Sequence, residues 1–522
     1  MRRIKLVILA NSTRHNCEIN SIIKNLEFKY TNITILYTNS ELISKKSFFY
    51  KILLKVIFTI EKRFFKTDTK LLKKKNVFIS IQKLLLDQYI FSQFSNSKFF
   101  ADVIIDLSSH NINRDLLKKT RFGVWKLNYG VKENFYIGLY DCLHNKKITK
   151  AYLTKSFFSN NRIITSCIDV SYLNNKTNFW LRNKQFIIDK SLNLVSKNLN
   201  KIYYNLPFQN YKINYKKKYT NPKLINLCLY IINKYFYYFF KKINIFNKKR
   251  SLWSLHITKY NKKIFVNGKL DITKSIKIKS SKNTEWADPF VIKFKDKNYV
   301  FFENNDLIHN KGKISVGELK NSELTNIKDI LNFNYHLSYP FIWKFNNDIY
   351  LIPETSAKKS IHIWKAKIFP TQWMYFKKLL KNEFCVDTTI VKDKFNNNWL
   401  LTNKSNDKTG DPNNELYVYK IIGNFKKLIP HQLNPVITDS RIARNAGMLY
   451  KSKQLFRPSQ INDSTGYGIG LNINRITKLD ISSYKEKIIK KNFSYKTIAN
   501  TDGLHHVNNS TKYIIFDVRY KI

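Results

Sequence analysis

Five strand-hairpin units recur roughly 50 to 60 residues apart in the C-terminal half of the chain, and this repeat constrains the fold most. Each unit begins with a polar or Pro-containing corner, continues through an apolar strand and a polar tip, and ends on an aromatic-rich second strand. The units are 286–304, 336–356, 386–405, 443–460 and 503–518. Hairpins repeated at this spacing are typical of propeller blades. The sequence therefore predicts an all-β, five-bladed β-propeller over residues 253–522.

Equivalent positions of the repeats should converge, because the innermost strands of all blades line one central channel. The corner positions are Asp288, Tyr339, Asp387, Arg444 with Asn445, and His505 with His506. The second strands return to the same rim and carry Glu303, Glu354, Arg457, Gln460 and Asp517. Hydrophobic burial does not explain so many polar residues at inner positions. We therefore predict a ligand-binding funnel, although Asp288 and Asp387 could instead cap turns and Arg444 could be a buried carboxylate partner.

Paired carboxylates can perform glycoside chemistry, one as the acid and one as the base or nucleophile. Burial and like charge would separate their pKa values. We predict Asp288 and Asp387 as base and modulator, and Glu354 as the acid candidate. The residues predicted to bind substrate are Trp286, Glu303, Tyr339, Arg444, Asn445, Arg457, Gln460, His505 and His506. Because two like charges repel, the sequence also predicts that Asp288→Asn weakens ligand binding with little loss of stability.

Residues 1–200 alternate strand and helix patterns. The apolar strand runs are Lys5–Ala10, Ile33–Tyr37 and Asp102–Leu107, and the helical stretches are 41–66 and 80–98. Strands that alternate with helices predict an α/β domain with a doubly wound parallel sheet. Such sheets bind ligands beyond the carboxyl ends of their strands, which here means Asn11, Ser12 and residues 108–110.

Residues 201–252 form a basic connector around the apolar stretch 224–240, which basic clusters flank at 216–218 and 241–250. Two interpretations stay open: a helix packed on a domain, or an interfacial helix resting on an acidic membrane. The net charge of +56 is spread along the whole chain, so it favours acidic membranes or glycans over nucleic acid.

The five cysteines form no CxxC pair, which fits a reducing compartment. The N-terminal apolar run of about six residues is shorter than a signal peptide requires. The sequence also has no run of about 18 uncharged apolar residues, which a transmembrane helix needs. We therefore expect a cytoplasmic protein, peripheral at the inner face of the membrane.

The propeller repeats resemble a known family. The segments WADPF, HLSYPF, IPETS, IFPTQW, DTTI, ARNAG, FRPSQ and YGIGLNINRI, over about 280–518, resemble the propeller domain at the N-terminus of plant glucosamine inositolphosphorylceramide transferases and in bacterial relatives. That domain resembles the five-bladed furanosidase-type glycosidase propeller. The resemblance implies that Asp288 takes the place of the general base and Asp387 that of the modulating Asp. It assigns no general acid, and the glycosyltransferase domain of the plant proteins has no counterpart here.

Residues 1–200 resemble, in a degenerate form, the formyltransferase-like domain that bacterial relatives carry ahead of the propeller. DVIIDLS at 102–108 is similar to the strand before the active-site loop, and GVWKLNYG at 123–130 to the strand and loop that follow. The stretch from 136 onward resembles the region that holds the catalytic Asp. Formyltransferases use an Asn, a His and an Asp; Asn128 matches the Asn, but the His is absent nearby and residues 158–161 lack the Asp. We therefore predict that formyl transfer is absent.

Together these features predict a protein of glycan or glycolipid assembly with a carbohydrate-binding propeller, its ligand a carbohydrate or glycolipid. If the chain is an enzyme, we expect a transferase acting on carbohydrate. Three alternatives stay open: a sugar N-formyltransferase that uses formyl-tetrahydrofolate, a propeller glycosidase or transglycosidase, and a non-catalytic membrane-docked scaffold. We expect no metal, and no cofactor outside the formyltransferase alternative.

Overall fold

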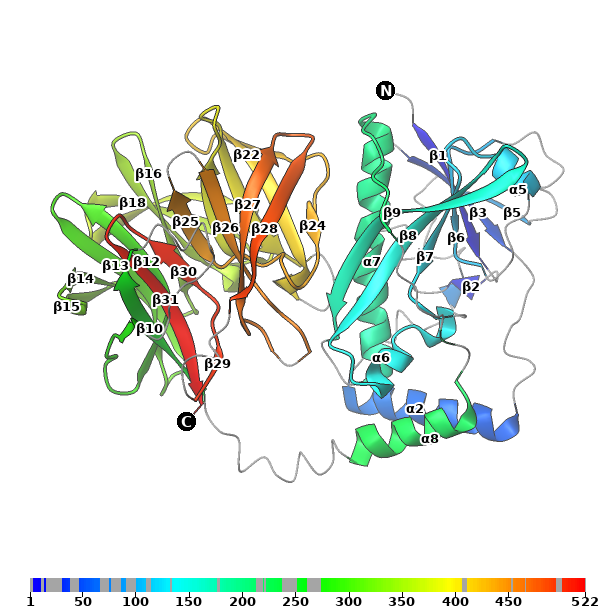
Figure 1. Ribbon diagram of the computed structural model, residues 1–522, viewed down its shortest axis with the longest axis horizontal. Coiled ribbons are helices and arrows are strands. Elements are labelled where there is room, and N and C mark those ends of the chain that lie inside the picture. Colours follow the sequence, from blue (N-terminus) through cyan, green and yellow to red (C-terminus); the bar gives the residue numbers. More distant parts are fainter. Residues whose placement is uncertain are drawn as a thin grey trace. The chain divides into compact units, whose positions relative to one another are not determined.

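The computed structural model divides the chain into two compact units, residues 1–246 and residues 247–522 (Figure 1). The residues that the structure describes are 3–10, 14–15, 31–37, 47–65, 75–76, 86–90, 100–108, 114–131, 134–175, 179–212, 219, 222–236, 251–260, 274–405, 411–451, 454–464, 466–493 and 500–521. Asn11, Ser12, Ser109 and His110, which were predicted to line a ligand site, lie outside them.

Unit 1 is an α/β unit built on a sheet with the strand order β5-β3-β1-β6-β7-β8-β9. The strands are β1 (Ile4–Ala10), β3 (Thr31–Tyr37), β5 (Leu86–Ile90), β6 (Val103–Asp106), β7 (Val124–Asn128), β8 (Ile148–Ser159) and β9 (Arg162–Asn174). The pairs from β5 through β7 are parallel, and β8 and β9 extend the sheet antiparallel. A small separate pair joins β2 (Arg14–His15) to β4 (Lys75–Asn76). The predicted α/β class is confirmed.

The helices of unit 1 pack on this sheet and on each other. They are α2 (Phe48–Phe65), α5 (Arg114–Lys118), the 3-10 turn η2 (Asn134–Tyr136), α6 (Leu139–Leu143), α7 (Trp180–Tyr203), α8 (Leu224–Ile231) and the π-helical η3 (Ile232–Phe236). One apolar stripe of α7, with Phe186, Ile187 and Leu194, joins the core of the sheet. Among the described helices, none has the length and apolar content needed to cross a membrane.

The helix predicted over 80–98 is wrong for residues 86–90, which form strand β5. This segment pairs in parallel with β3, from Leu86 opposite Ile33 to Ile90 opposite Tyr37. A short apolar run can form either a strand or one to two turns of helix. The periodicity of so short a run does not distinguish the two.

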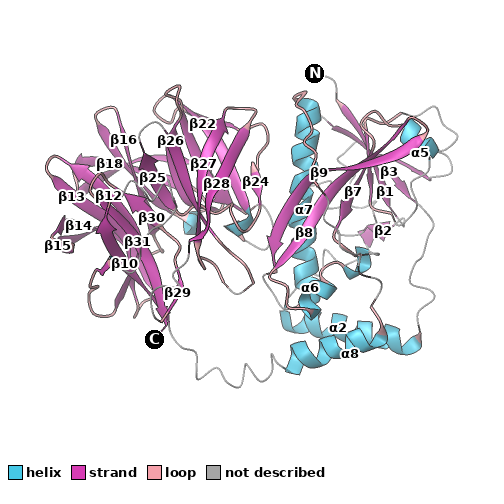
Figure 2. Cartoon of the chain, in the orientation of Figure 1, coloured by secondary structure: helices cyan, strands magenta, loops and turns pink. Residues whose placement is uncertain are grey.

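Unit 2 is a β-propeller of five blades in its described residues, which confirms the predicted all-β class (Figure 2). Blade one is β12 (Thr284–Phe294), β13 (Lys297–Asp306), β14 (Lys311–Lys320) and β15 (Glu323–Leu331). Blade two is β16 (Ser338–Phe345), β17 (Asp348–Glu354), β18 (Ile361–Ile368) and β19 (Gln372–Leu379). Blade three is β20 (Cys385–Lys392), β21 (Asn398–Lys404), β22 (Glu415–Ile422) and β23 (Lys427–Pro430), with β24 (Ile437–Thr438) paired to β22.

The last two blades close the ring. Blade four is β25 (Gly447–Lys451), β26 (Gln454–Gln460), β27 (Leu471–Leu479) and β28 (Tyr484–Phe493). Blade five is β30 (Val507–Asn509), β31 (Tyr513–Lys521), β10 (Ser251–Lys259) and β11 (Ile276–Lys277), with β29 (Thr501–Gly503) paired to β31. The first strand of the unit, β10, thus pairs along its whole length with the last strand, β31. This pairing of the two ends removes the sheet edges that an open ring would leave.

Candidate functional site

Three blades aim a side chain inward through the same local distortion. Asp288, Tyr339 and Asp387 follow the start of the first strands of blades one, two and three, and each lies in a β-bulge. Their φ angles are 50°, 46° and 47°, in the left-handed region that non-glycine residues seldom adopt. A bulge adds one residue to a strand and redirects its side chain. Such strain at equivalent positions is typical of functional sites.

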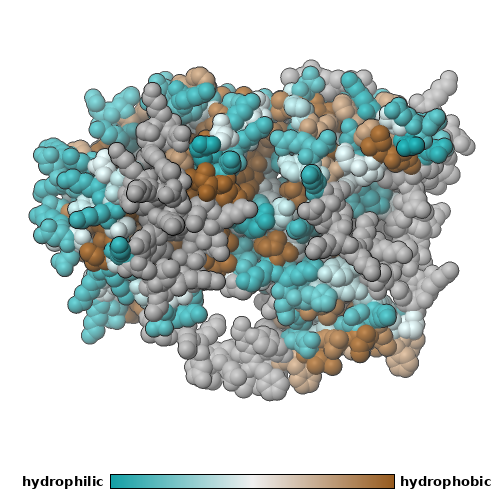
Figure 3. All heavy atoms as spheres, in the orientation of Figure 1, coloured by the Kyte–Doolittle hydropathy of each residue, from teal (hydrophilic) through white to brown (hydrophobic). Residues whose placement is uncertain are grey.

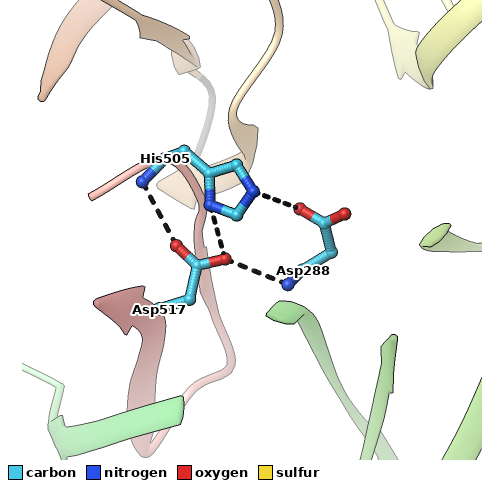
Figure 4. A group of neighbouring side chains, drawn as sticks. All are labelled: Asp288, His505 and Asp517. Atoms are coloured by element: carbon cyan, nitrogen blue, oxygen red, sulfur yellow. Dashed lines mark hydrogen bonds and ion pairs between the residues drawn. The ribbon is translucent and has the colours of Figure 1, made fainter. Parts of the chain in front are cut away.

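Asp288 sits in an ion-paired triad with His505 and Asp517 (Figure 4). The Nδ1 atom of His505 lies 2.8 Å from Oδ2 of Asp517, and its Nε2 atom lies 3.6 Å from Oδ1 of Asp288. Burial favours a neutral imidazole, but the charges of Asp517 and Asp288 outweigh it and raise the pKa of His505 to about 9. His505 is therefore a cation at neutral pH.

The same contacts keep Asp288 ionised. Burial would raise the pKa of its carboxyl, but His505, His506 and Arg444 lower it to about 2. Its Oδ2 atom also accepts a hydrogen bond from the backbone N–H of Tyr339 at 3.1 Å. Asp517 in turn accepts the backbone N–H of Asp288 at 3.0 Å and that of His506 at 2.9 Å. The bulge conformation and the charge of Asp288 thus stabilise each other.

Asp387 pairs with Arg444, as the sequence analysis considered. Arg444 donates from Nε to Oδ2 of Asp387 at 2.6 Å and from Nη1 to Oδ1 of Asn413 at 2.9 Å. Gln460 donates to the same Asp387 oxygen at 3.2 Å. Burial pushes the pKa of Asp387 upward, and the guanidinium of Arg444 opposes that shift. Arg444 remains partly exposed, so it can contact a ligand as well as Asp387.

Glu354 is a partly exposed carboxyl that is held protonated. It ends β17, and the hydroxyl of Ser356 donates to its Oε1 atom at 2.7 Å. Enclosure by protein and the charge of Asp387 raise the pKa of Glu354 to about 8, against the opposing effect of Arg444. Asp288 contributes to the same shift, so these four groups lie within electrostatic range of one another. At neutral pH Glu354 can therefore donate a proton or a hydrogen bond, whereas Asp288 accepts.

Glu303 and His336 form a second pair near Asp288. The Nε2 atom of His336 lies 3.2 Å from Oε1 of Glu303. Burial and the charge of Asp288 raise the pKa of Glu303, and the hydrogen bond to Glu303 raises the pKa of His336. Gly312 makes room for this pair, because a Cβ there would come within 2.7 Å of the His336 ring and 2.5 Å of the carbonyl oxygen of Leu337.

Two aromatic side chains that the sequence did not single out, Tyr467 and Trp253, lie beside Arg444 and His505. Tyr467, in the loop between β26 and β27, is 40% exposed, and the guanidinium of Arg444 lies 5.3 Å from the centre of its ring. The ring of Trp253 stacks on His505 at 3.8 Å and lies beside Tyr467. Tyr467 belongs to the segment YGIGLNINRI, which carried the family resemblance but not the hairpin repeat, and His336 starts the second repeat unit.

Several predicted binding residues are buried instead of lining the funnel surface. Arg457 has a fully buried side chain and forms two hydrogen bonds to Glu486. Trp286 packs in the apolar core and donates to Asn304. The other predicted binding residues that are buried are Tyr339, Asn445, Gln460, His505 and His506, and the catalytic candidates Asp288 and Asp387 are buried as well. Tyr339 accepts the backbone N–H of Gly447, and Asn445 bonds the backbone of Asp387 and Leu401, so both support the strands that carry the site.

Asp288, His505 and Asp517 also have donor atoms within 4.8 Å of one another, a spacing that can suit a metal ion. A metal needs a neutral imidazole. Here both ring nitrogens of His505 face carboxylates, and the pKa of about 9 keeps the ring protonated at neutral pH. A bound metal ion and a protonated His505 therefore exclude each other at this site.

Asn128, the candidate of unit 1, lies at the end of β7. Its side-chain amide donates to the hydroxyl of Thr154 at 2.8 Å and to the carbonyl of Lys126 at 3.3 Å. Phe158 and Ser159 end β8, and Asn160 and Asn161, which take positive φ, form the turn of the β8–β9 hairpin. The formyltransferase-like resemblance of this unit stays a prediction.

Comparison with known proteins places the propeller in a family context. Residues 267–515 match the family "Glucosamine inositolphosphorylceramide transferase 1, N-terminal", which confirms the resemblance predicted for this region. Glucosamine inositolphosphorylceramide transferase 1 of Oryza sativa subsp. japonica is 30% identical over 206 residues, which are 38% of this chain and 27% of the relative. The protein of that name from Arabidopsis thaliana is 29% identical over 206 residues, which are 38% and 26% of the two chains. This chain thus spans about a quarter of the length of these relatives.

Two solved structures are similar to part of this chain at low identity and with TM-scores below 0.5. The catalytic domain of Coprinopsis cinerea GH62 α-L-arabinofuranosidase is 12% identical and covers 46% of this chain and 93% of its own, with a TM-score of 0.33. The GH43_1 enzyme from Xanthomonas citri complexed with xylose is 8% identical and covers 46% and 87%, with a TM-score of 0.34.

Proposed function

From the match of residues 267–515 to that transferase family, we propose that the chain acts in glycolipid or glycan assembly and binds a carbohydrate in its propeller funnel. The observation that carries the proposal is the convergence of charged and aromatic groups at the funnel surface. Glu303, Glu354 and Arg444 are partly exposed, and Tyr467 presents part of its ring beside Arg444.

This set suits a sugar ring on physical grounds. A sugar offers hydroxyls that both donate and accept, together with one apolar face. The ring of Tyr467 can cover that apolar face, while the planar fork of Arg444 can hold two neighbouring hydroxyls. Glu354, which is partly exposed and protonated at neutral pH, offers a hydrogen-bond donor beside Arg444. The matching family description names glucosamine, which makes an amino sugar the first ligand to test.

We expect Tyr467→Ala and Glu354→Gln to weaken sugar binding. Loss of the aromatic contact should cost about 1.4 kcal/mol, which is about tenfold in affinity. Calorimetric titration of the full chain with glucosamine, glucose and a panel of nucleotide sugars measures this, and glucosamine should bind more tightly than glucose. The matched controls are Tyr375→Ala and Glu323→Gln, two exposed propeller residues outside the funnel. Equal affinities in funnel and control variants would reject the funnel as the binding site.

The two shifted carboxyls favour a second candidate function, a glycosidase or transglycosidase. Such enzymes pair a protonated acid with an ionised carboxylate, and the pKa values of about 8 for Glu354 and about 2 for Asp288 meet this requirement at neutral pH. We expect any hydrolysis of alkyl glycosides, whose leaving oxygen needs a proton, to fall as the pH rises above 8, because Glu354 loses its proton there. Glu354→Gln should abolish the activity. Activity that persists in Glu354→Gln with an unchanged pH profile would exclude Glu354 as the acid.

A further inference from the structure

Helix α2 in unit 1 has three separate faces. Its buried residues Tyr50, Leu54, Ile57 and Glu61 follow the i, i+4, i+7, i+11 spacing of one helix face. Its exposed residues divide into two further groups, one apolar and one basic. An ordinary surface helix has one apolar face toward the core and one polar face toward water. The second apolar face of α2 is therefore unexplained by the packing of unit 1.

The buried face fixes α2 firmly to helices α7 and α8. The carboxylate of Glu61 accepts the backbone N–H groups of Trp180 and Leu181 at the N-terminus of α7, and also the hydroxyl of Tyr230 in α8 at 2.5 Å. Tyr50, Leu54 and Ile57 share one apolar cluster with Tyr230 and Leu227. A carboxylate at a helix N-terminus satisfies N–H groups that have no partner within the helix. The orientation of α2 and α8 within unit 1 is thus set by buried contacts.

The outward faces of the two helices carry large apolar side chains. On α2, Phe48 and Phe49 are 74% and 70% exposed, and Ile52 and Val56 follow on the same side. The exposed apolar residues of α8 and η3 are Leu224, Ile225, Leu229, Ile232 and Phe236, and Ile225, Leu229 and Ile232 lie in line. Their spacing of i, i+4, i+7 gives one stripe that faces away from the buried Leu227 and Tyr230. Figure 3 shows hydrophobic atoms gathered over the ends of α2 and α8.

The exposed charged residues of these helices are basic. Lys51, Lys55 and Lys62 form the exposed basic face of α2, and Lys223 precedes α8. Arg63, seven residues after Val56, lies at the C-terminal end of the apolar face. Within the described residues of α2, α8 and η3, the acidic residue is Glu61, and it is buried. An apolar face bordered by lysines, with no exposed acid on the same described helices, is the pattern of helices that lie in a membrane interface.

We propose that the exposed faces of α2 and α8 form one platform that docks unit 1 on a lipid bilayer with anionic headgroups. Phe48, Phe49, Ile52, Ile225 and Ile232 enter the boundary between headgroups and acyl chains, and the lysines contact lipid phosphates. From the sequence, the stretch 224–240 predicts one interfacial helix. The structure shows a second exposed apolar face on α2, and α2 packs against α8 through a shared apolar cluster. The proposal is independent of the sugar-binding funnel in unit 2.

A second copy of the chain fits this surface less well. A twofold contact between identical faces would bring Lys51, Lys55 and Lys62 toward the same residues of the other copy. Like charges placed together in an interface cost affinity. An anionic bilayer instead complements the lysines and accepts the apolar side chains at the same time.

Vesicle flotation of the full chain tests the proposal. We expect the protein to float with phosphatidylcholine vesicles that contain about 30% phosphatidylglycerol and to bind pure phosphatidylcholine at least roughly tenfold more weakly. Raising the salt from about 0.1 M to about 1 M should weaken binding, because the screening length falls from about 10 Å to about 3 Å. The double variant Phe49→Ser/Ile225→Ser should lose at least roughly tenfold in vesicle affinity, because two large apolar contacts with lipid disappear.

The control is Ile308→Ser/Phe395→Ser, which removes two equally exposed apolar side chains from the propeller. All four substituted residues are exposed, so thermal unfolding should be close to that of the wild type in both variants. Equal flotation of the platform variant, the control and the wild type would overturn the proposal. So would a wild-type dimer in sedimentation that the platform variant dissociates while neither protein binds vesicles.

Discussion

Replacing Arg457 with Met is expected to lower the free energy of unfolding of the propeller by about 3–5 kcal/mol, because it leaves a buried charge unpaired. Arg457 donates to both carboxylate oxygens of Glu486, at 2.9 Å and 2.6 Å. It also donates to the carbonyls of Ile442 and Ala443. Arg457→Met therefore leaves several buried acceptors without their hydrogen-bond donor. Urea unfolding of the full chain, followed by tryptophan fluorescence, measures the shift.

The matched control is Lys478→Met in the same blade, where Lys478 and Asp480 form an exposed pair at 3.7 Å. Such surface pairs contribute at most about 1 kcal/mol. The double variant Arg457→Met/Glu486→Leu should recover part of the stability, because it also removes the buried carboxylate that Arg457→Met leaves unpaired. If Arg457→Met instead unfolds like the wild type and loses sugar binding, Arg457 is a ligand residue, as the sequence alone predicts.

The stability of the propeller is expected to fall by about 3 kcal/mol as the pH rises from 6.5 to 9, because His505 loses its proton over this range. The folded-state pKa of His505 is about 9, above the ordinary value of 6.5. The ion-paired contribution is therefore complete below pH 6.5 and disappears as the pH rises through 9. Denaturant unfolding at a series of pH values measures this slope.

His505→Gln should remove most of that slope, whereas His309→Gln, at an exposed histidine beside Asp306, should leave it unchanged. Glu354, whose pKa is raised to about 8, also lowers the stability as the pH rises, and it does so in both the wild type and His505→Gln. The contribution of His505 is therefore the difference between His505→Gln and the wild type. An identical slope in the two proteins would mean that His505 is not charged in the fold.

The hairpin repeat predicted the propeller because its two signals can be read directly along the chain. These signals are the spacing of the units and the order of polar corner and apolar strand within each unit. Equivalent corners then converge by geometry, and Asp288, Asp387, Arg444 and His505 do meet in unit 2. What the repeat does not determine is depth along the channel. A bulge places one extra residue in the strand, so the neighbours of Asp288 and Asp387 alternate between funnel and core in a way that sequence spacing does not reveal. Tyr339 and Trp286, which the sequence predicts to bind substrate, are buried.

The structure also changes what Asp288→Asn should do. From sequence, Asp288 and Asp387 are two like charges, and removing one should relieve repulsion. In the fold, His505, His506 and Arg444 hold the pKa of Asp288 at about 2, below the ordinary 3.8. The ionised carboxylate therefore stabilises the fold above pH 3.8, and this contribution disappears as the pH falls through 2. The cations that reverse the expectation come from blades four and five, distant in sequence from Asp288.

Tyr467 was missed because it lies in a loop outside the repeat. Its segment YGIGLNINRI was informative as a family resemblance, but neither spacing nor periodicity marks the Tyr as a funnel residue. Only the fold brings it beside Arg444 and Trp253. An exposed aromatic ring in a loop next to a charged funnel is a feature of tertiary structure alone.

A crystal structure of the full chain grown with glucosamine, at a concentration that saturates the calorimetric titration, tests the central claim most directly. We predict electron density for the sugar ring in the propeller funnel, with one face against Tyr467 and its polar groups within hydrogen-bond distance of Glu354 and Arg444. Sugar density at another surface of the chain, with the Arg444–Asp387 pair unchanged and the funnel filled only by solvent, would contradict the account.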